Sequence, residues 1–193
     1  MKDQIWTQKI ILVALCMSIS ACLQVFADHF IYWKPSLLTE FWRLWTAHWV
    51  HVGWIHYLLN MLAFACLPFI FPHVRNWHLW ALLAILPPFI SLIFYFNFPY
   101  IEAYAGLSGV LHGLYTAVGL VYLQYVHERK FAILVLALIA AKLIWENTLG
   151  QGNTAQLIGS PVLTEAHWLG ALGGLLCGVA YLFAKKLDRE HVS

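Results

Sequence analysis

Six stretches of the chain are apolar over roughly 20 residues or somewhat fewer, which is enough to cross a membrane. They cover residues 10–26, 57–72, 77–98, 107–126, 131–149 and 166–184. The composition agrees, since the chain is 62% hydrophobic and only 10% charged. No remaining stretch is long enough for a second folded domain. We therefore predict an all-α membrane protein whose residues 1–193 form a single domain, a bundle of six transmembrane helices.

Cationic side chains are distributed unequally between the two sides of this predicted bundle. The two termini and the 73–77 and 127–130 turns share one side, which carries Lys2, Lys9, Arg75, Arg129, Lys130, Lys185, Lys186 and Arg189. The other side carries only Lys34 and Arg43. The positive-inside rule therefore predicts that both termini lie in the cytoplasm. The formal net charge of +2 is too small to indicate nucleic-acid binding.

The first span allows two interpretations. Lysines before an apolar run, and "ISAC" at residues 19–22, resemble a cleaved lipoprotein signal. An uncleaved anchor is favoured, because cleavage would leave five spans and disturb the charge asymmetry. The four cysteines also lie within spans, so no disulfide framework is expected; they are Cys16, Cys22, Cys66 and Cys177.

Two outer loops differ in character. Residues 27–55 are rich in tryptophan and histidine, which predicts an interfacial first outer loop rather than solvated coil. Its His48 and His51 suit either lipid headgroups or a structural role. Residues 150–165 are rich in Gly, Asn, Thr and Ser, which predicts the most mobile part of the bundle, a candidate gate.

Polar side chains stand at the outer starts of three predicted spans, at a similar depth. They are His56 with Asn60, Ser108 with His112, and His167. Polar groups are costly in hydrocarbon and usually mark a site. A serine hydroxyl needs a base such as a neutral imidazole, so Ser108 and His167 are the candidate catalytic pair. The only acid close to His167 in the chain is Glu165, on another helix face, which favours a dyad over a triad.

Glycines flank these candidates. Gly106 and Gly109 would let a substrate backbone approach the serine, and a helix start there offers free N–H groups to an oxyanion. His56 and Asn60 share a helix face and could add donors. Gly170, Gly174 and Gly178 recur every four residues, a spacing that favours close helix packing and would bring His167 to Ser108.

Other interpretations of the polar residues stay open. Lys142 and Glu146 are four residues apart, which favours mutual neutralisation over substrate binding. A non-enzymatic membrane protein could bind haem or a metal through its histidines, His48, His51, His56, His112 and His167. A transporter would need polar groups through the full membrane depth, whereas here they cluster near one face. The protease hypothesis requires no metal or other cofactor, and no H-E-x-x-H zinc motif occurs.

The motifs resemble those of the rhomboid intramembrane serine proteases. The family order of a W-R pair, H-x-x-x-N, G-x-S-G and A-H-x-x-G is matched by Trp42-Arg43, "HYLLN" at 56–60, "GLSG" at 106–109 and "AHWLG" at 166–170. G-x-S-G alone is a weak signal, but the ordered set is specific.

The resemblance implies a role for each matched residue. Ser108 is the nucleophile and His167 the base, while His56, Asn60 and the "GLSG" segment with Gly106, Leu107 and Gly109 surround the oxyanion and substrate. Arg43 and His51 order the first outer loop, and Gly170 supports the histidine helix. His112 replaces a tyrosine that many members pack against the catalytic histidine, so it could orient His167 or only fill space.

A narrower resemblance is to the bacterial rhombosortase branch, carried by "GLSGVLHG" and by "KLIWE" at residues 142–146. This branch implies single-span membrane substrates with a C-terminal tail of Gly-Gly, one span and a basic end. It also implies a multi-pass protein of the inner membrane, embedded in the lipid bilayer, whose site opens to the periplasm.

Overall fold

The computed structural model describes residues 2–148 and 152–192, and almost all of its regular structure is helical. Six helices coincide with the six predicted spans. They are α1 (Lys2–Gln24), α3 (Trp54–Ile70), α4 (Asn76–Asn97), α5 (Ser108–Tyr122), α6 (Arg129–Thr148) and α8 (Thr164–Val192). Four of them, α1, α4, α6 and α8, are long and apolar enough to cross a membrane, and α3 is a shorter apolar helix.

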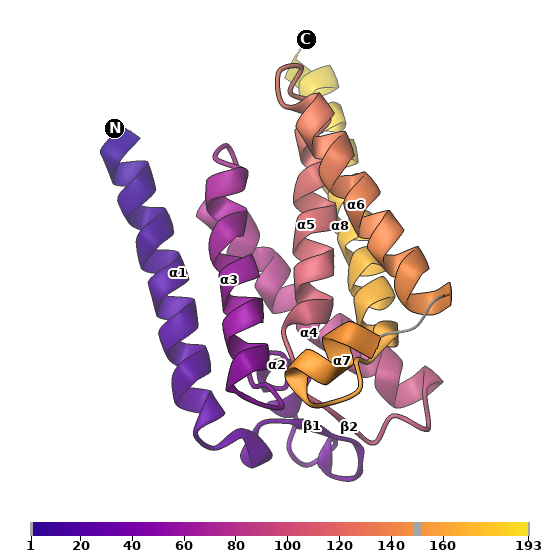
Figure 1. The fold of residues 1–193 in the computed structure, drawn as a ribbon. Coiled ribbons are helices and arrows are strands. Elements are labelled where there is room, and N and C mark those ends of the chain that lie inside the picture. The colour runs from indigo at the N-terminus through magenta and orange to yellow at the C-terminus, as the bar shows by residue number, and fades with distance from the viewer. Residues whose placement is uncertain (1, 149–151, 193) are drawn as a thin grey trace.

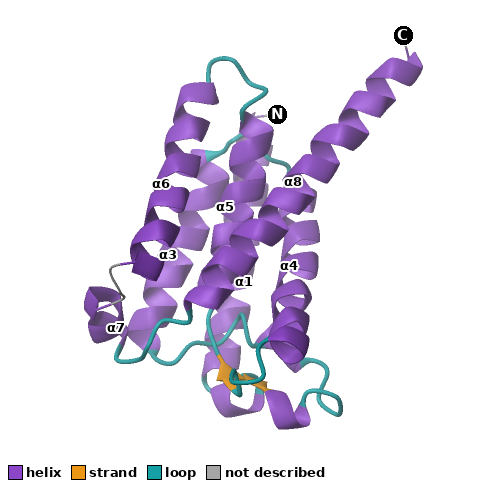
Figure 2. Ribbon diagram, turned by 90° about the vertical axis from the view of Figure 1, so that its right-hand side faces the viewer, coloured by secondary structure: helices purple, strands orange, loops and turns teal. Residues whose placement is uncertain are grey.

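The helices stand side by side, with both chain ends at one end of the bundle (Figure 1). The first outer loop, with α2 (Arg43–Thr46), lies at the opposite end together with α7 (Gly152–Ile158). Helix α5 is the innermost, because ten of its fifteen residues are buried. Helix α8 leans away from the bundle toward its C-terminal end (Figure 2).

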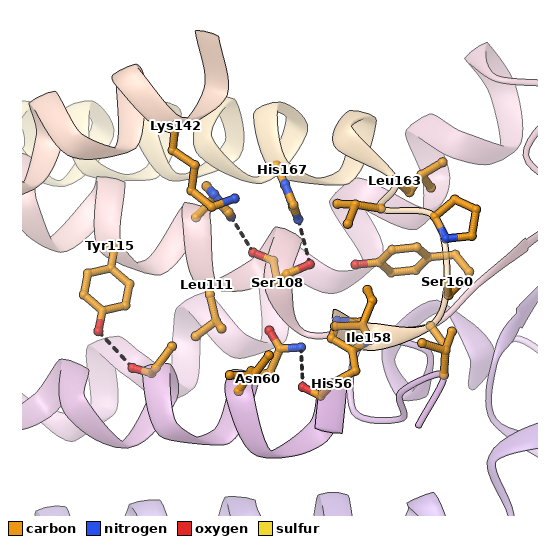
Figure 3. Close-up of a pocket in the computed structure, with 18 of the residues that line it drawn as sticks. His56, Asn60, Ser108, Leu111, Tyr115, Lys142, Ile158, Ser160, Leu163 and His167 are labelled. Atoms are coloured by element: carbon orange, nitrogen blue, oxygen red, sulfur yellow. Dashed lines mark hydrogen bonds between the residues drawn. The ribbon is translucent and has the colours of Figure 1, made fainter. Parts of the chain in front are cut away.

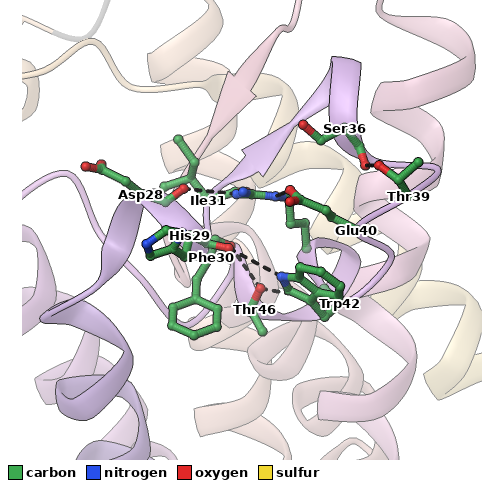
Figure 4. Close-up of polar contacts among 10 residues, drawn as sticks. Asp28, His29, Phe30, Ile31, Ser36, Thr39, Glu40, Trp42 and Thr46 are labelled. Carbon is green, nitrogen blue, oxygen red and sulfur yellow. Dashed lines mark hydrogen bonds and ion pairs between the residues drawn. The ribbon is translucent and has the colours of Figure 1, made fainter.

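Arg43 ties the first outer loop together, and Figure 4 labels its partners Asp28, Ile31 and Glu40. Its Nε donates to the Glu40 carboxylate, and its Nη1 donates to the carbonyl oxygens of Asp28 at 3.1 Å and Ile31 at 2.7 Å. One guanidinium thus joins the 28–31 stretch of the loop to Glu40, since it offers donors in several fixed directions. The loop also contains η1 (Ala27–His29) and η2 (Lys34–Ser36), both short 3₁₀ turns.

This loop is joined to the segment that leads into α5. Strand β1 (Tyr32–Trp33) pairs antiparallel with β2 (Ala103–Tyr104), with Tyr32 opposite Tyr104. Farther along, the Gly106 N–H donates to the Ala47 carbonyl at 3.0 Å. The start of α5 is therefore fixed by the first outer loop as well as by the neighbouring helices.

Helix α4 continues through Pro87 and Pro88. Pro88 has no N–H to donate to the carbonyl of Ala84, four residues earlier. The indole Nε1 of Trp45, on α2, donates to that oxygen at 2.9 Å instead. A tryptophan of the first outer loop thus satisfies a backbone group that a proline in the membrane leaves free.

Helices α5 and α8 meet backbone to backbone. A Cβ added at Gly170 would lie 1.8 Å from the Gly109 carbonyl oxygen, and one at Gly174 would lie 2.1 Å from that of Gly113. The predicted close packing of α8 through Gly170 and Gly174 is therefore confirmed. Only glycine permits such an approach, and it brings the first turns of the two helices together.

The last outer loop, which the sequence predicts to be the most mobile part of the bundle, contains a short helix. Its residues Gly152–Ile158 form α7, while 149–151 lie outside the described residues. The interfacial position of the first outer loop and the gating role of the last one remain predictions. All four cysteines are free.

Candidate active site

The first turns of α5 and α8 bring a hydroxyl and an imidazole into contact. His167 Nε2 lies 2.8 Å from Ser108 Oγ (Figure 3). His167 is only 3% exposed, so its ring is buried between the helices. The two candidates that were 59 residues apart in the sequence are thus a hydrogen-bonded pair.

The other nitrogen of His167 has a partner that the sequence analysis did not assign. Nδ1 lies 2.7 Å from Oε2 of Glu146, on α6. A dyad was expected because Glu165 was the nearest acid in the chain, but Glu165 accepts a hydrogen bond from the Tyr100 hydroxyl instead. The Ser108–His167 hydrogen bond fits the expected dyad. An acid from another helix also contacts His167, which the sequence analysis did not predict.

Lys142 and Glu146 form the ion pair that their spacing predicted. The Lys142 ammonium donates to Oε1 of Glu146, leaving Oε2 for His167. The Glu146 side chain is 7% exposed, whereas that of Lys142 is 48% exposed. A buried carboxylate with both oxygens occupied is far less costly than an isolated one.

His112 stacks on His167. The ring centroids are 4.3 Å apart and the planes differ by 18°. The Nδ1 of His112 donates to the Ser108 carbonyl at 2.7 Å, one helical turn earlier. His112 thus contacts the catalytic candidate directly and limits rotation of the imidazole plane.

Helix α3 approaches the serine from the opposite side, carrying His56 and Asn60 (Figure 3). Asn60 Nδ2 donates to the His56 carbonyl at 3.0 Å. The His56 ring lies against Gly106, where an added Cβ would be 2.8 Å from its Cε1 and where φ is +145°. The structure therefore requires glycine at position 106 for a reason other than substrate approach, because a side chain there would push His56 away.

These side chains line a cavity of about 540 Å³. Its polar lining includes His56, Asn60, Ser108, His112 and His167, and its apolar lining comes mainly from α3, α5 and residues 158–163. Helix α5 begins at Ser108, so its first N–H groups have no partner within the helix. The cavity thus brings a serine hydroxyl, an imidazole and the start of a helix together with polar side chains of α3.

Other predicted site residues lie outside this cavity lining. Leu107 is fully buried in the core. The Cβ position of Gly109 faces the Ala166 carbonyl of α8, and Gly170 faces Gly109. These residues shape the site through backbone packing.

The loop histidines lie behind the cavity. His51 packs edge-on against His56, with ring centroids 5.1 Å apart, and its backbone N–H donates to Gln24 of α1 at 2.7 Å. His48 Nε2 lies 3.0 Å from Ser91 Oγ. Both are buried, which agrees with a structural role better than with lipid-headgroup binding.

Among the described residues, one group of three could hold a metal ion: His112, Glu146 and His167, whose ligand atoms lie within 4.8 Å of one another. Both nitrogens of His167 already have partners in Ser108 and Glu146. A cation would have to displace one of them. The five histidines of the metal-binding alternative do not converge, since His48, His51 and His56 are outside this group.

The position of Glu146 had a signal in the sequence. Glu146 lies near the end of the predicted span 131–149, on the side where the predicted spans of Ser108 and His167 begin. Its depth in the membrane is therefore predicted to match theirs.

Comparison with known proteins places the chain in a family. No curated protein matches the chain. The family model described as the Rhomboid domain matches residues 38–185, which include every residue of the site described above. The chain therefore belongs to the rhomboid family and is an intramembrane serine protease with a hydrogen-bonded Ser108–His167 pair.

Proposed function

We propose that Ser108 is the nucleophile and His167 the general base of an endopeptidase that cleaves single-span membrane proteins near the outer face of the membrane. The observation that carries this assignment is the 2.8 Å contact between Ser108 Oγ and His167 Nε2 at the cavity wall. A hydroxyl held on an imidazole is the arrangement that makes serine nucleophilic near neutral pH.

The reaction follows from these positions. Oγ attacks the scissile carbonyl carbon while its proton moves to His167 Nε2. The oxyanion is stabilised by the N–H groups at the start of α5 and by donors from His56 and Asn60 across the cavity. The C–N bond then breaks as Nε2 returns the proton to the leaving amine, and water hydrolyses the acyl-enzyme by the same steps.

The proposed substrates carry a C-terminal tail of Gly-Gly, one span and a basic end, as the rhombosortase resemblance implies. Both stretches that carry this resemblance supply a residue that contacts His167: His112 from "GLSGVLHG" and Glu146 from "KLIWE". Gly-Gly also suits the chemistry, because each glycine weakens a helix by about 1 kcal/mol relative to alanine. A substrate span must unwind before its carbonyls can react.

We further propose that all six long helices span a bacterial inner membrane, with both termini cytoplasmic and the cavity opening to the periplasm. Both termini lie at one end of the bundle, as an even number of crossings requires (Figure 1). The site lies at the other end, where the chain carries few cations.

Reaction with a fluorophosphonate probe tests the catalytic assignment. The full chain in detergent or bicelles should be labelled, and Ser108→Ala and His167→Ala should not be labelled. Ser160→Ala is the matched control, because Ser160 also lines the cavity but has no assigned role. Labelling that persists in Ser108→Ala would refute the assignment.

A pair of reporters tests the substrate class. Each carries a soluble domain, Gly-Gly or Leu-Leu, one span and a basic end. We expect cleavage of the Gly-Gly reporter at least about tenfold faster, because its span unwinds more easily. Equal rates would contradict the proposed tail specificity without affecting the serine protease assignment.

A further inference from the structure

Glu146 is unusual for its helix. Of the described residues of α6, only Ala132 and Glu146 are buried, and most of the helix faces outward. A carboxylate directed inward from an apolar span is costly unless it has a specific partner, and such groups are usually functional. Lys142 alone would satisfy the charge, so the contact with His167 needs a separate explanation.

The hydrogen bonds fix where the proton of His167 lies. A carboxylate only accepts hydrogen bonds, so the 2.7 Å contact with Glu146 Oε2 requires the proton on Nδ1. Nε2 then carries the lone pair that faces Ser108 Oγ at 2.8 Å. The opposite tautomer would place N–H against the serine and leave no base.

We propose that Glu146 is the positioning residue of a Ser108–His167–Glu146 triad, and that Lys142 keeps this carboxylate ionised within the membrane. This rests on the proposed function of Ser108 and His167. Glu146 selects the reactive tautomer and stabilises the imidazolium that forms when Oγ gives its proton to Nε2. It takes up no proton itself, and the proton leaves with the amine product.

Among the residues that the structure describes, no other group around His167 can do the same. His112 lies parallel to the ring and uses its Nδ1 on the Ser108 carbonyl, so it limits the ring plane but not the tautomer. The Glu165 carboxylate accepts a hydrogen bond from the Tyr100 hydroxyl. Lys142 is a cation and would oppose an imidazolium if Glu146 did not lie between them.

The test compares Glu146→Gln, Glu146→Asp and the control Glu165→Gln in the full chain. Fluorophosphonate labelling is followed over probe concentration, which separates the maximal rate from the concentration giving half that rate. In Glu146→Gln we expect the maximal rate to fall by about 10²–10⁴-fold, with little change in the half-saturating concentration, because an amide can donate to Nδ1 and favours the wrong tautomer. Glu165→Gln should match the parent.

A spectroscopic readout separates positioning from folding. With ¹⁵N-labelled histidine, the parent should show an Nδ1–H proton shifted far downfield by the carboxylate, and Glu146→Gln should lose it. If Glu146→Gln does not fold, Glu146→Asp serves instead. This variant keeps the negative charge but moves it away from Nδ1 by the length of one methylene. It should be labelled more slowly than the parent, and faster than Glu146→Gln where that variant folds.

The outcomes are distinct. Parental labelling rates in folded Glu146→Gln or in Glu146→Asp would overturn the triad and leave His167 acting in a dyad. Labelling that survives Ser108→Ala would instead overturn the proposed function, whatever Glu146 does.

Discussion

His167 is held by contacts of two different kinds. Toward α5 it is positioned by a seam of backbone contacts, which we call the glycine seam: Gly109, Gly113, Gly170 and Gly174. Toward α6 it is held by the side chain of Glu146, in a helix that otherwise buries little. Helix α6 also meets α5 through side chains, because an added Cβ at Gly119 would approach Leu136 rather than backbone.

The two kinds of contact differ in how far they can adapt when a helix moves. Main chain packed on main chain has no rotamers to adjust, so the glycine seam holds α5 and α8, and with them Ser108 and His167, at a fixed separation. A contact made by side chains adapts when a helix shifts. Ser108 and His167 are thus held rigidly, while the third member of the proposed triad depends on a peripheral helix.

The largest effect should come from breaking the glycine seam. In Gly170→Ala, the new Cβ would lie 1.8 Å from the Gly109 carbonyl oxygen, so α5 and α8 must separate. We expect loss of fluorophosphonate labelling and a large fall in thermal stability. Gly119→Ala is the control: its Cβ would lie 3.0 Å from Cδ2 of Leu136, a side-chain atom that can move. Equal stability of the two variants would contradict the rigid seam.

A smaller effect should distinguish the interiors of the two regions. Leu114 on α5 is fully buried, whereas Leu138 on α6 is 60% exposed. Leu114→Ala leaves a cavity and should cost about 2–5 kcal/mol of unfolding free energy. Leu138→Ala leaves none and should cost less than about 0.5 kcal/mol. Denaturation in mixed micelles measures the unfolding free energy of both variants. Similar losses would contradict the loose packing of α6.

The smallest effect is a loss of stability at acidic pH, which we expect to originate in the first outer loop. Burial lowers the pKa of His48 to about 3, well below its usual range. The unfolded chain therefore binds a proton first as pH falls. The contribution of His48 to the free energy of unfolding is fully present above about pH 6.5. It is lost as the pH falls toward 3, at up to about 1.4 kcal/mol per pH unit.

His48→Gln checks this by thermal denaturation at pH 7 and pH 5. Glutamine can still bond Ser91 but does not titrate, so the variant should lose less stability on acidification than the parent. The same loss in both would assign acid sensitivity to other groups, including those around the glycine seam.

Much of the fold was readable from the sequence because a membrane imposes simple rules. Apolar runs of sufficient length predicted the six long helices, and the four-residue spacing of Gly170 and Gly174 predicted close packing of α8. Ser108 and His167 could be paired because polar groups at one depth on different helices are improbable by chance. Helix α7 was missed, since its Gly- and Asn-containing sequence favours irregular structure.

The sequence by itself determined which chemistry is present: a serine, a histidine and small residues at the ends of apolar helices, spaced so that one face carries each group. Only the tertiary structure decided which acid contacts the histidine. Glu165 is two residues from His167 but points to Tyr100, while Glu146 is 21 residues away and reaches Nδ1. Helical periodicity sets the face on which a residue lies within its own helix, but the rotation of one helix against another is set by packing, which no local spacing records.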